Sequence, residues 1–97
     1  MSMHNPPHPG EFIKEIYMEP YRLSSRRVAS NLNVSHSTLT RLINGDSSIT
    51  PEMALRLSLV LGRSPESWLA MQDNYSLWIA KKKLDLSSVK KLELASA

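Results

Sequence analysis

The polar side chains between Asn33 and Gly45 have the types and spacing of a surface that recognises another molecule. This stretch reads NVSHSTLTRLING, and its Ser and Thr residues form helices poorly because their hydroxyls compete for backbone hydrogen bonds. Val34, Leu39 and Leu42 nevertheless recur as the buried face of a helix would. The opposite face would carry short donors and acceptors and one guanidinium, from His36, Ser37, Thr38, Thr40 and Arg41.

This outward face is suited to reading DNA. Short hydroxyl side chains let a helix lie close to base edges and hydrogen-bond either the bases or the phosphates. Arg41 suits either the O6 and N7 atoms of a guanine or a phosphate. The same hydroxyls could instead be ordinary solvated surface. The choice between these interpretations depends on the elements that position the side chains.

Two short helices joined by a tight turn would hold that face in place. Ser24 is a good N-cap for the first and Ser35 for the second, and Asn33 tolerates the left-handed backbone of such a turn. The small side chain of Ala29 lets the two helices approach closely. Residues 24–44 are therefore predicted to form a helix-turn-helix, whose second helix enters the DNA major groove.

Two arginines occupy an unfavourable place in the first of these helices. Arg26 and Arg27 lie in its first turn, where the helix dipole disfavours each cation by about 0.3 to 1 kcal/mol. Taken alone they would be a solvated face. Beside a reading helix they can neutralise phosphates, because the first helix of this motif crosses the DNA backbone.

Proline and glycine mark the limits of the remaining helices. A first helix is expected from Pro9, a fourth from Pro51 to Gly62 and a fifth from Pro65. The inner face of the first would carry Phe12, Ile13, Ile16 and Tyr17. No stretch alternates over enough residues to suggest a strand, so the fold class is predicted to be all-α, a compact five-helix domain.

The 97 residues are expected to form one domain. Residues 1–8 would be a flexible N-terminal arm, 9–84 the helix-turn-helix domain and 85–97 a C-terminal tail, which could form another helical turn or two from Ser87. No apolar run resembles a membrane span or signal peptide, which favours a cytoplasmic protein. The formal charge of +3 leans towards an anionic partner.

The sequence favours no enzyme, no metal site and no cofactor. It contains no cysteine, and His4 and His8 have no second ligand at a metal-binding spacing. Its Ser and His residues lack the glycine-framed turn that presents a hydrolytic nucleophile.

The fifth helix is rich in aromatic residues that do not share one narrow stripe. This distribution predicts that one side packs on the domain and another meets a partner chain. A large aromatic core is the alternative. The candidate interface residues are Trp68, Met71, Tyr75, Trp78 and Ile79.

Three parts of the chain resemble a known family. They are HPGE at residues 8–11, VSHSTLTRLING at 34–45 and SPESWL...Q..YSLW at 64–78. From about His8 to Lys81 the chain closely resembles the HigA-type (VapI-like) antitoxins, a branch of the Xre, Cro and C1-type repressor superfamily. The resemblance implies a lambda-repressor-like fold.

The resemblance also implies a homodimer that represses its own operon and neutralises a HigB-like toxin, an mRNA-cleaving ribonuclease. The family's DNA-facing positions fall on Ser25, His36, Ser37, Thr38 and Arg41, with a phosphate-contacting position at Asn44. Asn33 stands where Gly is usual, Ser76 where Asp is common and His36 where the branch often has Arg. The last difference leaves the operator sequence open.

The resulting hypothesis is a two-fold dimer that reads successive major grooves, about 34 Å apart, on an inverted-repeat operator. The complete DNA-facing set is Ser25, Arg26, Arg27, Ser35, His36, Ser37, Thr38, Thr40, Arg41 and Asn44. Two alternatives stay open: a stand-alone repressor without a toxin, and a protein-binding module that has abandoned DNA.

Overall fold

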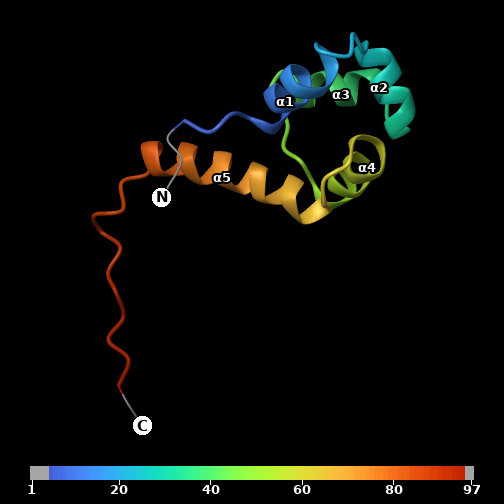
Figure 1. Ribbon diagram of the computed structural model, residues 1–97. Helices are drawn as coiled ribbons and strands as arrows, with labels where there is room; N and C mark the ends of the chain where they lie inside the picture. The colour runs from blue at the N-terminus through green and yellow to red at the C-terminus, as the bar shows by residue number, and fades with distance from the viewer. Residues whose placement is uncertain (1–4, 96–97) are drawn as a thin grey trace.

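The computed structural model describes residues 5–95, which form helices and connecting segments and contain no strand (Figure 1). The elements are α1 (Pro9–Phe12), the π-helix η1 (Ile13–Met18), α2 (Ser25–Leu32), α3 (His36–Ile43), α4 (Pro51–Leu61) and α5 (Pro65–Lys83). The all-α prediction is confirmed, with η1 continuing the first helix. No helix in this part of the chain has the length and apolar character needed to cross a membrane.

Hydroxyl side chains set the start of four helices, and two of them, Ser24 and Ser35, are the caps that the sequence predicted. Each accepts a hydrogen bond from the backbone N–H three residues later, and the four caps are Ser24, Ser35, Thr50 and Ser64. A cap of this kind contributes about 1 kcal/mol, because it satisfies a donor that the helix leaves unpaired. Asn33 ends α2 in the left-handed conformation (φ 57°, ψ 45°), and this turns the chain into α3.

The first helix buries a different face from the one expected. Ile16 was predicted to lie inside, but its side chain is 49% exposed, whereas Ile13 and Met18 are buried. The physical reason is the π-helical turn, in which the N–H of Glu19 donates to the carbonyl of Lys14 at 2.9 Å. Because the bond spans five residues instead of four, the next buried residue after Ile13 is Met18, five positions later, and Ile16 turns outward.

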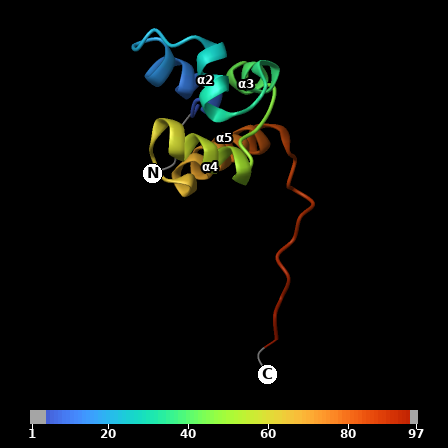
Figure 2. The ribbon, with the colours of Figure 1, turned by 90° about the vertical axis from the view of Figure 1, so that its right-hand side faces the viewer.

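The core lies between two groups of helices. Figures 1 and 2 show α1, α2 and α3 together on one side and α4 and α5 on the other. The buried apolar residues between them are Ile13, Met18, Val28, Ala29, Leu32, Leu39, Leu42, Ile49, Met53, Ala54, Leu57 and Trp68. This core holds α2 and α3 as a rigid pair, because α2 packs on both α3 and α4.

The segment before α1 is packed in place, which corrects part of the predicted flexible arm. His8 is buried, its Nδ1 accepts from the N–H of Gly10 and its Nε2 donates to the carbonyl of Ser47, both at 2.9 Å. Its ring also meets Tyr75 edge to face, with the ring centroids 5.0 Å apart. His8 therefore caps α1 and ties it to the loop after α3. Residues 1–4 of the arm, including His4, lie outside the described residues.

Gly10 allows the first helix to touch α3. A Cβ atom at this position would lie 1.8 Å from the carbonyl oxygen of Leu42. No side chain fits that space, so the glycine of the HPGE stretch sets the distance between α1 and α3.

Candidate nucleic-acid interface

The structure brings the predicted DNA-facing residues together at the surface of α2 and α3. The exposed members are Arg26, Arg27, Ser35, Ser37, Arg41 and Asn44, and the half-buried ones are Ser25, His36, Thr38 and Thr40. Ser25 Oγ and His36 Nε2 form a hydrogen bond of 2.7 Å that joins the start of α2 to the start of α3. This bond fixes the imidazole, so Nδ1 is the ring nitrogen that His36 can offer to a ligand.

The hydroxyls of α3 are held by hydrogen bonds within the helix. Ser35 Oγ accepts from the N–H of Thr38 at 3.1 Å and donates to Thr38 Oγ1 at 2.8 Å. Thr40 Oγ1 donates to the carbonyl of His36 at 2.8 Å. These bonds orient residues that form helices poorly. They also leave the hydroxyls of Thr38 and Thr40 with different hydrogen-bonding capacity towards a ligand. Thr38 can still donate its hydroxyl proton outward, whereas Thr40 can only accept.

Three arginine charges lie uncompensated around this polar face. Within residues 5–95, the guanidinium groups of Arg26, Arg27 and Arg41 are exposed and have no hydrogen-bond or ion-pair partner. Arg26 and Arg27 lie beside the positive end of α2, so their charges reinforce the helix dipole. The result is a local positive potential around a row of oriented hydroxyls, which suits an anionic ligand with polar edges.

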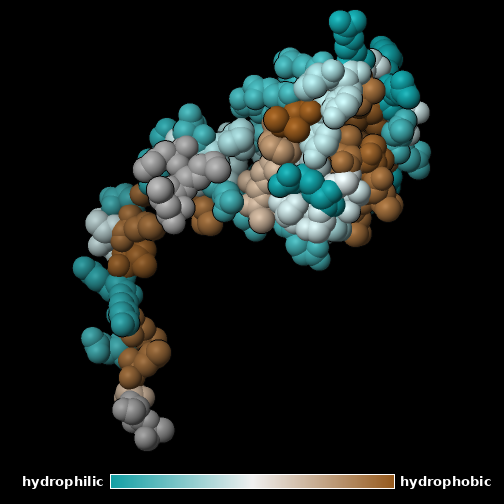
Figure 3. Space-filling model, viewed as in Figure 1, coloured by the Kyte–Doolittle hydropathy of each residue, from teal (hydrophilic) through white to brown (hydrophobic). Residues whose placement is uncertain are grey.

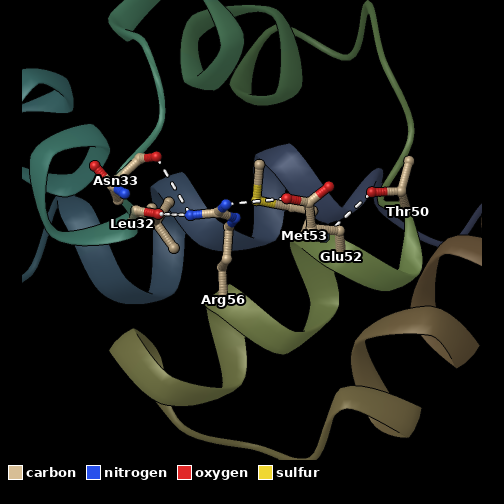
Figure 4. Close-up of polar contacts among 6 residues, drawn as sticks. All are labelled: Leu32, Asn33, Thr50, Glu52, Met53 and Arg56. Carbon is tan, nitrogen blue, oxygen red and sulfur yellow. Dashed lines mark hydrogen bonds and ion pairs between the residues drawn. The ribbon is translucent and has the colours of Figure 1, made fainter.

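Arg56 holds the turn between α2 and α3, a role that the sequence reasoning missed. It extends from α4, and its Nη1 donates to the carbonyls of Leu32 at 2.8 Å and Asn33 at 3.3 Å (Figure 4). Its Nη2 pairs with Glu52 at 2.9 Å. The guanidinium therefore satisfies carbonyls at the end of α2 and keeps the left-handed turn in position. The i, i+4 spacing of Glu52 and Arg56 could have revealed the ion pair, but no sequence signal marks the carbonyl contacts.

Gln72 fixes the loop that follows α3 and was also missed. This buried side chain accepts from the N–H of Ile49 at 2.9 Å and donates to Ser76 Oγ at 3.1 Å. It lies one helical turn after Trp68 on α5 and is the Q of the stretch SPESWL...Q..YSLW, and these two signals could have found it. By anchoring Ile49 it restrains the loop from Asn44 onward, and so the end of the polar surface of α2 and α3.

The candidate interface residues of α5 divide between the core and the surface. Trp68 is fully buried, and its Nε1 donates to the carbonyl of Gly62 at 2.9 Å, so its predicted interface role is corrected to a core role. The rest are half-buried: Met71, Tyr75, Trp78 and Ile79. Their interface role stays a prediction. The exposed Leu77, 57% accessible, was not among the candidates.

No group of three or more potential metal-ligating side chains occurs in the described part of the chain. The polar surface itself carries hydroxyl, imidazole, amide and guanidinium groups on α2, α3 and the turn that follows.

Known proteins share this arrangement. Residues 13–68 match the helix-turn-helix family HTH_3. The uncharacterized HTH-type transcriptional regulator YddM of Escherichia coli (strain K12) is 40% identical over 92 residues, 95% of this chain and 97% of that one. An addiction module antidote protein of a HigA family from Coxiella burnetii is 38% identical, with a TM-score of 0.77 over 84% of this chain and 87% of the other. The structure of antitoxin GraA in complex with its operator is 28% identical, with a TM-score of 0.85 over 97% and 99%.

These matches cover α2, α3 and the helices that hold them, the same elements that carry the polar surface. The matched family is one of DNA-binding regulators and antitoxins and is not a class of enzymes. The chain belongs to the Xre-type helix-turn-helix family, in the branch of the HigA-type antitoxins.

Proposed function

We propose that this protein is the antitoxin of a toxin–antitoxin pair, and that it represses its own operon and neutralises a HigB-like mRNA-cleaving toxin. The observation that carries the proposal is the surface of α2 and α3. Three exposed arginines surround a row of hydroxyls that the helix itself orients, and Arg56 and the core hold both helices rigidly. A DNA-reading surface needs this combination of fixed geometry and positive charge.

In this proposal two copies place their α3 helices in successive major grooves of an inverted-repeat operator. Phosphates are bound by Ser25, Arg26, Arg27 and Asn44, with Ser35 and Thr40 at the margin of the contact. Base edges are read by His36, Ser37, Thr38 and Arg41. The operator complex of antitoxin GraA, whose fold this chain shares, supports the same use of the fold here.

The two-fold dimer is formed through α5 in this proposal. Once Trp68 is assigned to the core, the surface that is left consists of Met71, Tyr75, Leu77, Trp78 and Ile79. Aromatic and aliphatic side chains of this kind are typical of the centre of a subunit interface. The toxin would bind elsewhere on the folded domain, and the HigA-family antidote protein of Coxiella burnetii supports the antitoxin role.

The first test is a titration of the purified protein against its own upstream promoter and a scrambled duplex at two salt concentrations. We expect the promoter to bind about a thousandfold more tightly, with affinity falling steeply as salt rises, because phosphate contacts release counterions. Equal affinity for the two duplexes would refute sequence reading by α3. Light scattering of the same sample tests the dimer, and a monomer with and without DNA would overturn the symmetric arrangement.

A stand-alone repressor is the second candidate, favoured by the similarity to a protein described as a transcriptional regulator. Co-purification with the product of the neighbouring gene separates the two functions. A stable complex that suppresses ribonuclease activity supports the antitoxin, whereas promoter binding without such a partner supports the plain repressor.

A further inference from the structure

Two leucines of α4 face the solvent and take no part in the core. Leu55 and Leu59 lie one helical turn apart and are 58% and 89% exposed. The core side of α4 carries Met53, Ala54 and Leu57 instead. Figure 3 shows apolar surface on the right-hand side of the domain, where α4 lies in Figure 1. A cluster of exposed apolar side chains on a folded domain is a feature of surfaces that meet a partner.

A narrow groove between α2 and α4 adjoins these leucines. Val60 follows Leu59 on α4, and successive helix residues are about 100° apart, so Leu59 lies beside the wall that Val60 forms. The groove holds about 190 Å³ and is lined by Leu23, Arg27, Val28, Asn31, Val60 and Leu61. The two leucines and this groove form one largely apolar surface, which we call the α4 surface.

The α4 surface carries a positive charge at the groove. Arg27 lines it, and within residues 5–95 its guanidinium has no ion-pair partner. No carboxylate of these residues lines the groove, and Glu52 on α4 is already paired with Arg56 at 2.9 Å. A complementary partner therefore presents a carboxylate next to an aliphatic side chain, because it must pair the guanidinium and fill the apolar walls. Protein side chains supply both groups, whereas DNA phosphates supply only the charge.

Arg27 is the one residue that the α4 surface shares with the other surfaces assigned to this protein. α4 adjoins the start of α5, whereas the candidate dimer residues begin at Met71 and the tail leaves the opposite end of α5 (Figure 1). A partner on α4 therefore leaves the two-fold contact accessible. Arg27, in contrast, is also a phosphate-binding residue of the proposed function. One guanidinium cannot pair fully with a phosphate and a carboxylate at once, so DNA and the partner compete for it.

We propose that the α4 surface binds the HigB-like toxin, through an aliphatic side chain that enters the groove and a neighbouring carboxylate that pairs with Arg27. This inference rests on the toxin–antitoxin pair of the proposed function, to which it adds the docking site and the sign of the coupling. Because the toxin's carboxylate takes Arg27 from a DNA phosphate, toxin binding weakens operator binding. Operator binding weakens toxin binding by the same factor, as thermodynamic linkage requires.

Replacement of the two leucines tests the docking site. The probe is the purified product of the neighbouring gene, titrated calorimetrically into the full-length chain. The double variant L55Q/L59Q should bind it about tenfold or more weakly, because the apolar contact is lost. Its promoter affinity should stay within about twofold of the native value, since glutamine changes neither the charge nor the helix. Ile16→Gln is the matched control, because Ile16 is an exposed aliphatic residue of another helix, outside the groove, and should leave both affinities unchanged.

Replacement of Arg27 tests the competition. Saturating the native chain with the same gene product should lower its promoter affinity by about tenfold. In Arg27→Ala this reduction should fall to about twofold or less, because the group that both ligands use is gone. Arg41→Ala is the control: Arg41 lies on α3 and does not line the groove, so the variant should bind the promoter more weakly but keep the full tenfold reduction.

The outcomes distinguish failure of this inference from failure of the proposed function. Weaker toxin binding by L55Q/L59Q at unchanged promoter affinity, with loss of the coupling in Arg27→Ala, supports the docking site. Native-like toxin affinity of the leucine variant overturns it, even if the native chain neutralises the toxin and reads the promoter. A toxin that strengthens promoter binding also overturns it, as does a leucine variant that is monomeric where the native chain is dimeric. If the native chain forms no complex with the gene product, the antitoxin function and this inference are refuted together.

Discussion

The helix-turn-helix and α5 begin with the same local device but differ in what determines their exposed faces. Ser24, Ser35 and Ser64 each cap a helix by accepting a backbone N–H. On α3 the polar surface follows from local hydrogen bonds, such as that from Thr40 to His36 one turn earlier. On α5 the division between core and surface follows from packing against distant elements. Local chemistry thus orients the polar face of α3, whereas tertiary contacts decide which side chains of α5 stay at the surface.

The two tryptophans of α5 should respond most differently to replacement by alanine, because one lies in the core and the other at the surface. Trp68→Ala should lower the free energy of unfolding by about 3 to 5 kcal/mol, because it leaves a cavity in the core and loses the bond to Gly62. Trp78→Ala should leave stability nearly unchanged and weaken the dimer, because Trp78 is half-buried, with Lys82 above its ring. Urea denaturation measures the first effect and sedimentation the second. Equal stability losses would contradict the division of α5.

Removal of Arg56, which joins α4 to the turn between α2 and α3, should lower both the stability of the fold and the affinity for the promoter. Arg56→Ala is expected to cost about 1 to 3 kcal/mol of stability, because the carbonyls of Leu32 and Asn33 lose a charged donor. Promoter affinity should fall too, since the turn between α2 and α3 is no longer held. Glu52→Gln is the control, because it removes only an exposed ion pair, worth about 0 to 1 kcal/mol. If both variants behave alike in denaturation and promoter binding, the contacts of Arg56 with the two carbonyls contribute neither to stability nor to DNA affinity.

Arginines on the two helices of the motif should differ in how they affect specificity. Arg41→Ala should weaken promoter binding by about 1 to 3 kcal/mol and relax base preference, if its guanidinium reads a guanine. Arg27→Ala should weaken promoter and scrambled duplex alike and reduce the salt dependence by about one counterion. Titrations at several salt concentrations distinguish the two patterns. A uniform loss for Arg41→Ala would assign that side chain to a phosphate.

Sequence patterns predicted the helix-turn-helix and the polar face of α3 better than the rest of the molecule. The helix-turn-helix was predictable because caps, the Asn33 turn and the apolar spacing all act within a few residues. Ile16 and Trp68 were misjudged for different reasons. A π-turn shifts the buried face by one residue, and a tryptophan on a helix gives no sign of which neighbour covers it. His8 looked like part of a loose arm because its partners, Ser47 and Tyr75, are distant in sequence.

The sequence by itself determined where the helices start, how α2 turns into α3 and which polar residues α3 presents. These features depend on backbone donors, hydroxyls and a left-handed asparagine within one or two helical turns. Only the tertiary structure decided which aromatic residues of α5 are core, how Arg56 locks the turn and how closely α1 approaches Leu42 over Gly10. Those contacts join segments far apart in the chain, and the geometry that brings them together exists only once the core has formed.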